Sequence, residues 1–282
     1  MIKDILVHLD GGAEDETRVA HARMLAEANG ARLVGVLTAL LPAFRVLADG
    51  VGDEGARHYD ADARARCETH MARLEAIRLE LCRRFANSAA MREVLRIDGF
   101  PETVCAQLVR EVRRADLLVA TCPYRAGHRR WDGLVEAAML EGGRPLYLVP
   151  PGRPPADRIR SVVVAWKDGR ELARAVGDAM PLLADAAGAT LVCVPEPENP
   201  DPSDGLDAWA EHLRWHGVRA SCRMLDGDAG PVGRLMIEEA HRLGADLIVL
   251  GAYGHSRLRE WLVGGTTRDL LRLSDIPLLV AH

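Results

Sequence analysis

Short uninterrupted apolar runs alternate along the chain with segments in which apolar residues recur every three or four positions. In the second half, "RSVVVAW" and "ADLIVL" are uninterrupted runs, whereas "RELARAVGDAMPLLADA" places Leu172, Val176 and Leu183 at helical spacing. Uninterrupted apolar runs indicate strands that are buried on both faces, as in a parallel sheet between layers of helices. With right-handed crossovers, the alternation predicts a doubly wound α/β sheet.

The same pattern occurs twice. The run "DILVHLDGG" (4–12) matches "SVVVAWKDG" (161–169), and "GARLVGV" matches "GATLVCV", at an offset of 157 or 158 residues. Further along, "RADLLVAT" (114–121) matches "GADLIVLG" (244–251), and "RPLYLVP" matches "IPLLVAH", at an offset of 130 to 132. An insertion of about 28 residues after the second strand of the first half accounts for the change of offset.

The repeat predicts two doubly wound five-stranded parallel-sheet domains in tandem, of the Rossmann-like class. We place them at residues 1–149 and 159–282, with the insertion, a loop and a long helix, in the first. Residues 150–158, "PPGRPPADR", are rich in proline and lack apolar periodicity, so we expect a linker there.

In an open sheet of this kind a ligand binds beyond the carboxyl ends of the strands where the strand order reverses, here between the first and fourth strands. In the second half the fourth strand leads into "GAYGHSRLREWLVGGTTRDLL" (251–271). Glycine lets the backbone approach an anion closely or adopt a positive φ, and a helix N-terminus offers unpaired N–H groups and a positive dipole end. The candidate phosphate-binding residues are Gly251, Gly254, Gly264, Gly265, Thr266 and Thr267. The alternative is that the glycines only form a loop and Thr267 only caps the helix.

The first half differs at this position. It keeps Asp10 after its first strand but carries Thr121, Cys122, Pro123 and Tyr124 after its fourth. Pro123 removes a backbone donor, and the bulkier side chains narrow the approach to a phosphate. We expect that this half has lost its nucleotide site and supports the other half.

With these residues the second half resembles a universal stress protein domain of the ATP-binding subclass, and the whole chain resembles the tandem form of that family, with an adenine-nucleotide α-hydrolase-like fold. The family motif, G-x2-G-x9-G-[ST], begins at Gly251 and continues at Gly254 and Gly264, but ends at Gly265, which two threonines follow. The resemblance implies that the first two glycines lie against ribose and phosphates, and that residues 264–267 hold the phosphate chain of ATP, bound with Mg²⁺.

The resemblance implies roles for four further residues. Val194, at the end of the second strand, matches the residue that packs beside adenine. The aspartate that follows the first strand in the family falls on Lys167, which is followed by Asp168. Lys167 either reaches a phosphate or is solvated, and whether Asp168 takes over the ribose contact stays open. His255 either makes one phosphate hydrogen bond or is exposed.

Composition narrows the function classes. A net charge of −5 and a pI of about 6.1 provide no basic field for nucleic acid or anionic lipid, and aromatic residues make up only 4%. The N-terminus carries no signal-peptide pattern and no apolar run reaches roughly 20 residues, so we expect a cytosolic protein without a membrane contact. The six cysteines lack metal-ligand spacing, and we expect buried thiols and no metal centre.

The chain contains no P-loop, dinucleotide fingerprint, kinase signature or nucleophile elbow, so we expect no catalytic residue. The leading hypothesis is a stress-response or regulatory protein that binds ATP, or a related adenine nucleotide, in its second half and hydrolyses it slowly at most. Two alternatives stay open. One is an adenine-nucleotide α-hydrolase-like enzyme, and the other is an interaction scaffold that binds no nucleotide.

The last strand of each half is an apolar edge that would favour aggregation if it stayed bare. The family resemblance implies that these two strands pair across a pseudo-two-fold axis, so that the chain is an intramolecular dimer of its own halves. A homo-oligomer and an unidentified protein partner stay open.

Overall fold

The computed structural model describes residues 1–41, 53–85, 91–125, 131–195, 201–252 and 265–282 of the chain. The first half contains β1 (Asp4–Leu9), α1 (Glu14–Asn29), β2 (Arg32–Leu40), α2 (Asp53–Phe85), β3 (Met91–Gly99), α3 (Pro101–Arg114), β4 (Leu117–Thr121), α4 (Asp132–Glu141) and β5 (Leu146–Val149). The second half contains β6 (Ser161–Ala165), α5 (Arg170–Asp185), β7 (Gly188–Cys193), α6 (Ser203–Trp215), β8 (Ala220–Met224), α7 (Val232–Arg242), β9 (Leu247–Gly251), α8 (Gly265–Leu273) and β10 (Leu278–Ala281). Helices and strands alternate as the apolar pattern predicts.

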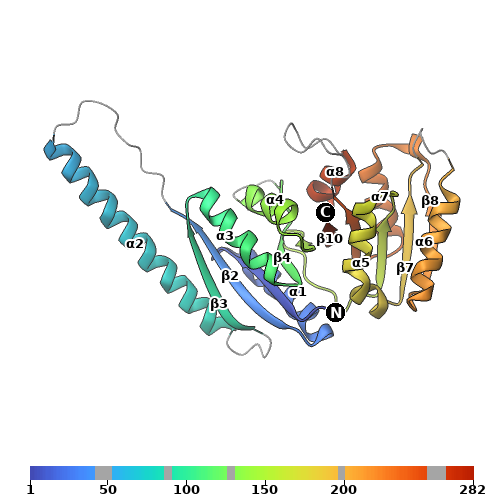
Figure 1. Ribbon diagram of the computed structural model, residues 1–282, viewed down its shortest axis with the longest axis horizontal. Helices are drawn as coiled ribbons and strands as arrows, with labels where there is room; N and C mark the ends of the chain where they lie inside the picture. The colour runs from blue at the N-terminus through green and yellow to red at the C-terminus, as the bar shows by residue number, and fades with distance from the viewer. Residues whose placement is uncertain (42–52, 86–90, 126–130, 196–200, 253–264) are drawn as a thin grey trace.

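All strands of the described segments belong to one ten-stranded sheet with the order β3-β2-β1-β4-β5-β10-β9-β6-β7-β8 (Figure 1). Within each half the pairs are parallel, and the first strand lies between the second and the fourth, which confirms the doubly wound class. The two halves meet through an antiparallel pair, β5 and β10, in which Tyr147 faces Leu279. The apolar last strands therefore protect each other, as the sequence predicts.

Two apolar cores, one on each face of the sheet, run continuously through both halves. Because strand residues alternate between faces, Tyr147 and Leu279 lie in one core while their neighbours Leu148 and Leu278 lie in the other. All four side chains are at most 1% exposed. Helices from both halves cover these cores, so burial and strand pairing together join the halves.

The region of the predicted insertion contains the 33-residue helix α2, whose counterpart in the second half, α6, has 13 residues; α2 extends past the sheet edge in Figure 1. Its C-terminal part packs on the sheet through the buried side chains of Leu74 and Leu81. Ile77 lies over the turn that follows β1, since a Cβ added to Gly11 would lie 3.1 Å from Ile77 Cγ2. The loop expected before this helix lies outside the described residues.

The predicted linker, 150–158, forms turns and irregular structure. Its Arg153 carbonyl accepts a hydrogen bond from His21 Nε2 of α1 at 2.9 Å, while Tyr147 Oη lies 3.2 Å from His21 Nδ1. The domain boundaries themselves stay predictions. In the part of the chain that the structure describes, no helix combines the length and the apolar character needed to cross a bilayer.

Candidate functional site

In each half the candidate site is the position at the carboxyl edge of the sheet where the strand order reverses, and we call this position the crevice of that half. In the first half this position lies between β1 and β4, and in the second half between β6 and β9. The two crevices are built from matching elements, so a residue-by-residue comparison shows which side chains occupy the same positions in each half.

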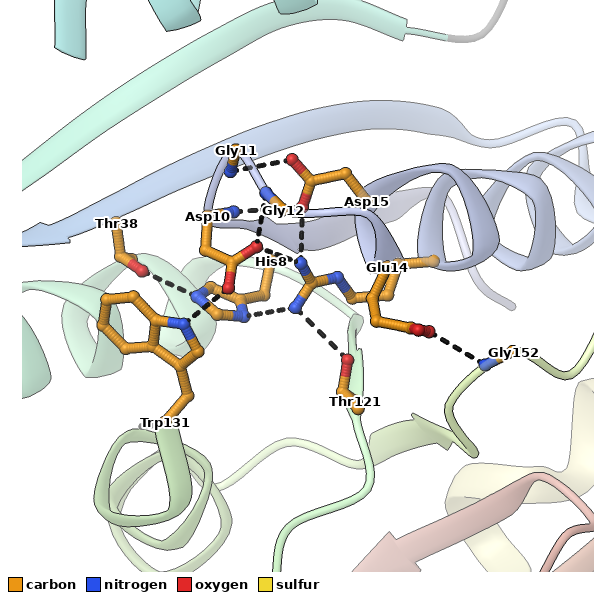
Figure 2. Close-up of polar contacts among 11 residues, drawn as sticks. His8, Asp10, Gly11, Gly12, Glu14, Asp15, Thr38, Thr121, Trp131 and Gly152 are labelled. Carbon is orange, nitrogen blue, oxygen red and sulfur yellow. Dashed lines mark hydrogen bonds and ion pairs between the residues drawn. The ribbon is translucent and has the colours of Figure 1, made fainter. Parts of the chain in front are cut away.

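Polar side chains of the first half fill its own crevice (Figure 2). Arg18, on the second turn of α1, donates through Nη2 to Asp10 Oδ1 at 2.7 Å and to Asp15 Oδ1. Through Nη1 the same guanidinium donates to Thr121 Oγ1 at 3.2 Å and to His8 Nδ1 at 3.1 Å. Arg18 is only 2% exposed, so one internal cation links the ends of β1 and β4 with α1.

Two carboxylates of this network also occupy the backbone donors that follow β1. Asp15 accepts hydrogen bonds from the N–H groups of Asp10 at 3.0 Å and Gly11 at 2.9 Å, and Asp10 Oδ1 accepts from Gly12 N–H at 3.1 Å. Such a turn before a helix is a typical place for a bound anion. Here the chain supplies the anion itself, and Arg18 supplies the compensating positive charge.

Trp131, just before α4, closes the network from the other side. Its indole Nε1 donates to Asp10 Oδ2 at 2.7 Å, and its ring meets the His8 ring edge-on with centroids 5.2 Å apart (Figure 2). Because Arg18 can only donate to Nδ1 of His8, the imidazole proton lies on Nε2, which donates to Thr38 Oγ1 at 2.6 Å. The network thus links β1, β2 and β4 with α1 and with the residue that precedes α4.

The electrostatics of the network follow from its burial. Burial and the neighbouring charge of Arg18 lower the pKa of His8 to about 3, so its imidazole is neutral. Burial opposes ionisation of Asp10, but the charge of Arg18 and the neighbouring hydrogen-bond donors together hold the pKa of that carboxyl well below its usual range. For Asp15 burial prevails, and the pKa is raised in spite of Arg18.

The second half replaces the members of this network with smaller or apolar residues. At the offset of 157 residues, Asp15 corresponds to Leu172 and Arg18 to Ala175, and both replacements are buried in the apolar core. Thr121 corresponds to Gly251. No internal ion pair therefore bridges β6, β9 and α5 among these positions.

Gly251, the last residue of β9, lies against the first turn of α5. A Cβ at this position would lie 2.6 Å from the Glu171 carbonyl carbon and 2.7 Å from the Leu172 nitrogen. Gly251 does not adopt a positive φ, so the conformational part of our expectation does not hold there. The structural requirement for glycine is the close approach of the helix to the strand, and a ribose or phosphate contact stays a prediction.

The N-terminal residue of α8, Gly265, is exposed among the described residues. A Cβ added to Gly265 would meet no atom within 4 Å, whereas Thr266 and Thr267 are half-buried. Helix α7 packs closely against α8, because a Cβ added to Gly233 of α7 would lie only 2.5 Å from Asp269 Cβ of α8. Gly254, His255 and Gly264 lie outside the described residues, and their predicted roles stay predictions.

The remaining candidates lie near the same edge. Val194 is buried after β7, with its Cγ1 3.2 Å from the position of a Cβ on Gly227. Lys167 and Asp168 follow β6 and are exposed, on the turn that precedes α5. Their contacts with a nucleotide are not tested by this geometry.

Sequence reasoning missed the network of the first half, although one signal for it was present. Asp15 and Arg18 occupy positions whose counterparts in the second half are apolar and buried. A charged pair three residues apart at buried positions of a helix indicates an internal ion pair. The repeat thus contained this information once its two copies were aligned residue by residue.

Comparisons with known proteins agree with the architecture. The family model described as "Universal stress protein family" matches residues 158–282. The Stress response protein NhaX of Bacillus subtilis is 29% identical over 99 residues, which are 32% of this chain and 60% of that protein. The Universal stress protein Slr1230 of Synechocystis is 50% identical over 34 residues, 12% of each protein. The matched region thus spans less than two thirds of either relative.

The fold of the whole chain also has a counterpart. The crystal structure of a universal stress protein from Archaeoglobus fulgidus superimposes with a TM-score of 0.66 at 13% identity, and the match covers 99% of this chain and 96% of that one. This likeness concerns the fold across both halves, whereas the family match concerns the sequence of the second. Residues 158–282 therefore match the universal stress protein family in sequence, and the whole chain has the fold of a universal stress protein of known structure.

Proposed function

We propose that the protein is a stress-response regulator that binds one adenine nucleotide per chain, as ATP with Mg²⁺, in the crevice of its second half. The observation that carries this proposal is the contrast between the two crevices. In the first half Arg18, Asp10 and Asp15 occupy the site with an internal ion pair network, and in the second half Ala175 and Leu172 remove it.

The chemistry of the second crevice supports an anionic ligand. The first backbone N–H groups of α8 have no partner within the helix and lie at the positive end of its dipole, and the hydroxyls of Thr266 and Thr267 would add donors. The exposed Lys167 adds a positive charge at the neighbouring turn. Mg²⁺ would be held mainly by phosphate oxygens and water, as is usual for this ion.

We propose binding rather than turnover as the biological activity. A hydrolase would need a positioned base or an acidic metal ligand at the crevice, and Asp168 is the acidic residue on the turn after β6. Occupancy of the site would then be read by a protein partner in the cytosol. Steady-state phosphate release far slower than nucleotide exchange supports this proposal, whereas rapid turnover abolished by Asp168→Asn favours the enzyme.

The test is equilibrium binding of Mg²⁺–ATP to the intact chain by calorimetry, with Gly265→Val as the site variant. Among the described residues a Cβ added to Gly265 meets no packed neighbour within 4 Å, so we expect valine there to obstruct a phosphate without disturbing the packing. Gly133→Val is the matched control, since Gly133 lies in the first turn of α4 and also has open space around it. We expect one site per chain, lost in the first variant and kept in the second.

Two outcomes would contradict this model. A stoichiometry near two would mean that the network around Arg18 opens and admits a nucleotide. No binding by the folded, nucleotide-free protein would leave the interaction scaffold as the better description. Circular dichroism of both variants verifies that the fold persists.

A further inference from the structure

Helix α6 carries two exposed imidazoles near its C-terminus, His212 and His216, that the proposed function does not use. His212 and His216 lie at positions i and i+4, a spacing that places two side chains on the same side of a helix. Their ring centroids are 4.8 Å apart with an interplanar angle of 64°, and both side chains are exposed.

We propose that His212 and His216 form a surface chelating site for one divalent transition-metal ion of the Cu²⁺, Ni²⁺ or Zn²⁺ class. Neutral imidazole nitrogen is a preferred ligand for these ions, and two histidines four residues apart on one helix face form a known chelating arrangement. In the described structure both imidazoles make ring contacts only, so no hydrogen bond or ion pair competes for their nitrogens.

The position on the helix favours a cation. His216 is the C-terminal capping residue of α6, and His212 lies in the last turn. The last carbonyl groups of a helix and its dipole give this end a partial negative charge. The neighbouring cation, Arg214, is held by Glu211 at 3.3 Å and by the carbonyl oxygen of Ala220 at 3.0 Å.

Trp209 completes the site as a neighbour and as a reporter. Its ring contacts His212 edge-on, with centroids 5.6 Å apart, and restricts that imidazole from one side. Within the described residues no three histidine, cysteine, aspartate or glutamate side chains gather into a metal-binding group. Water would therefore fill the remaining coordination positions, and binding would be weaker than in four-ligand structural sites.

The experiment is calorimetric titration of Ni²⁺ into the intact, metal-free chain at a pH above the ordinary imidazole pKa of about 6.5. We expect one ion per chain, and affinity at least roughly tenfold lower in His212→Gln and in His216→Gln, because loss of a ligand costs more than loss of an outer-shell partner. His241→Gln is the matched control, since His241 is also exposed but lies 2.7 Å from Asp275 Oδ1; it should bind as the wild type does.

A second readout locates the ion. Cu²⁺ should quench the fluorescence of the neighbouring tryptophans, Trp209 and the exposed Trp215, and the saturable component should disappear in His216→Gln. Undiminished Ni²⁺ binding in the double variant His212→Gln/His216→Gln would assign the ion to other ligands and overturn the proposal. Absence of binding to the folded wild type would overturn it as well.

Discussion

Acidification should destabilise the protein through His8, well above the pH at which its carboxylates titrate. The imidazole is 1% exposed, and in the folded state its pKa is lowered to about 3. In the unfolded chain the pKa of histidine is about 6.5. Between these values the unfolded state binds the additional proton, so folding stability is complete above pH 6.5 and falls as the pH decreases toward 3.

The magnitude follows from the two pKa values. Stability should fall by at most about 1.4 kcal/mol for each pH unit below 6.5. Between pH 7 and pH 5, His8 alone should lower the free energy of unfolding by about 2 kcal/mol. Burial also lowers the pKa of His21, which adds a contribution of the same sign.

The assay is urea unfolding, followed by circular dichroism, of the wild type and of His8→Gln at several pH values between 7 and 5. The variant keeps a polar side chain beside Thr38 and Arg18 but cannot titrate in this range. Its absolute stability will differ from that of the wild type, and the informative quantity is the slope of stability against pH. Between pH 7 and pH 5, we expect the free energy of unfolding of the variant to fall by about 2 kcal/mol less than that of the wild type.

His21→Gln is the comparison, because it removes the buried imidazole of α1, whereas His8 belongs to β1, and it leaves the first-half network intact. Equal slopes in wild type and His8→Gln would refute the reasoning, since they would mean that His8 is protonated in the folded state or accessible to water. The ion pairs around Arg18 would then need a different charge state from the one described above.

Three further perturbations test the packing of the two crevices. Arg18→Met should cost about 3–5 kcal/mol in urea unfolding, because it leaves two carboxylates without their cation, whereas Arg23→Met at the exposed surface should cost less than about 1 kcal/mol. Gly251→Ala should cost about 1–3 kcal/mol because its Cβ would meet the α5 backbone, and Gly265→Ala should stay within about 0.5 kcal/mol of wild type; equal midpoints for these two variants would contradict the close approach of α5. Trp131→Phe should cost about 1–3 kcal/mol, since it deletes the indole donor to Asp10, and an unchanged midpoint would show that water replaces this donor.

Much of the architecture could be predicted from the apolar pattern because the central strands are buried on both faces and the helices on one, while the edge strand β8 is more exposed. The repeat then fixed the number of strands per half and their order, and the apolar last strands indicated where the halves join. Continuous burial leaves few arrangements for sequences such as "SVVVA" and "LIVLG", which explains the agreement. The long helix of the insertion was likewise visible.

The state of each crevice depended on the tertiary structure. Gly251 looks like a phosphate-loop glycine in the sequence, yet its neighbours show that α5 approaches the strand too closely for any side chain. Arg18 and Asp15 lie together on α1, but Trp131 follows Asp10 by 121 residues, and only the fold brings its indole to that carboxylate.

The periodicity of apolar residues indicates which face of a helix or strand is buried, because the apolar side chains gather on that face. It does not report which polar atoms meet across elements, because a hydrogen bond requires two groups at one distance and one angle. The sequence alone therefore determined the class of fold and the location of the candidate site. The tertiary structure decided that one crevice is filled by its own side chains and that the other lacks this network.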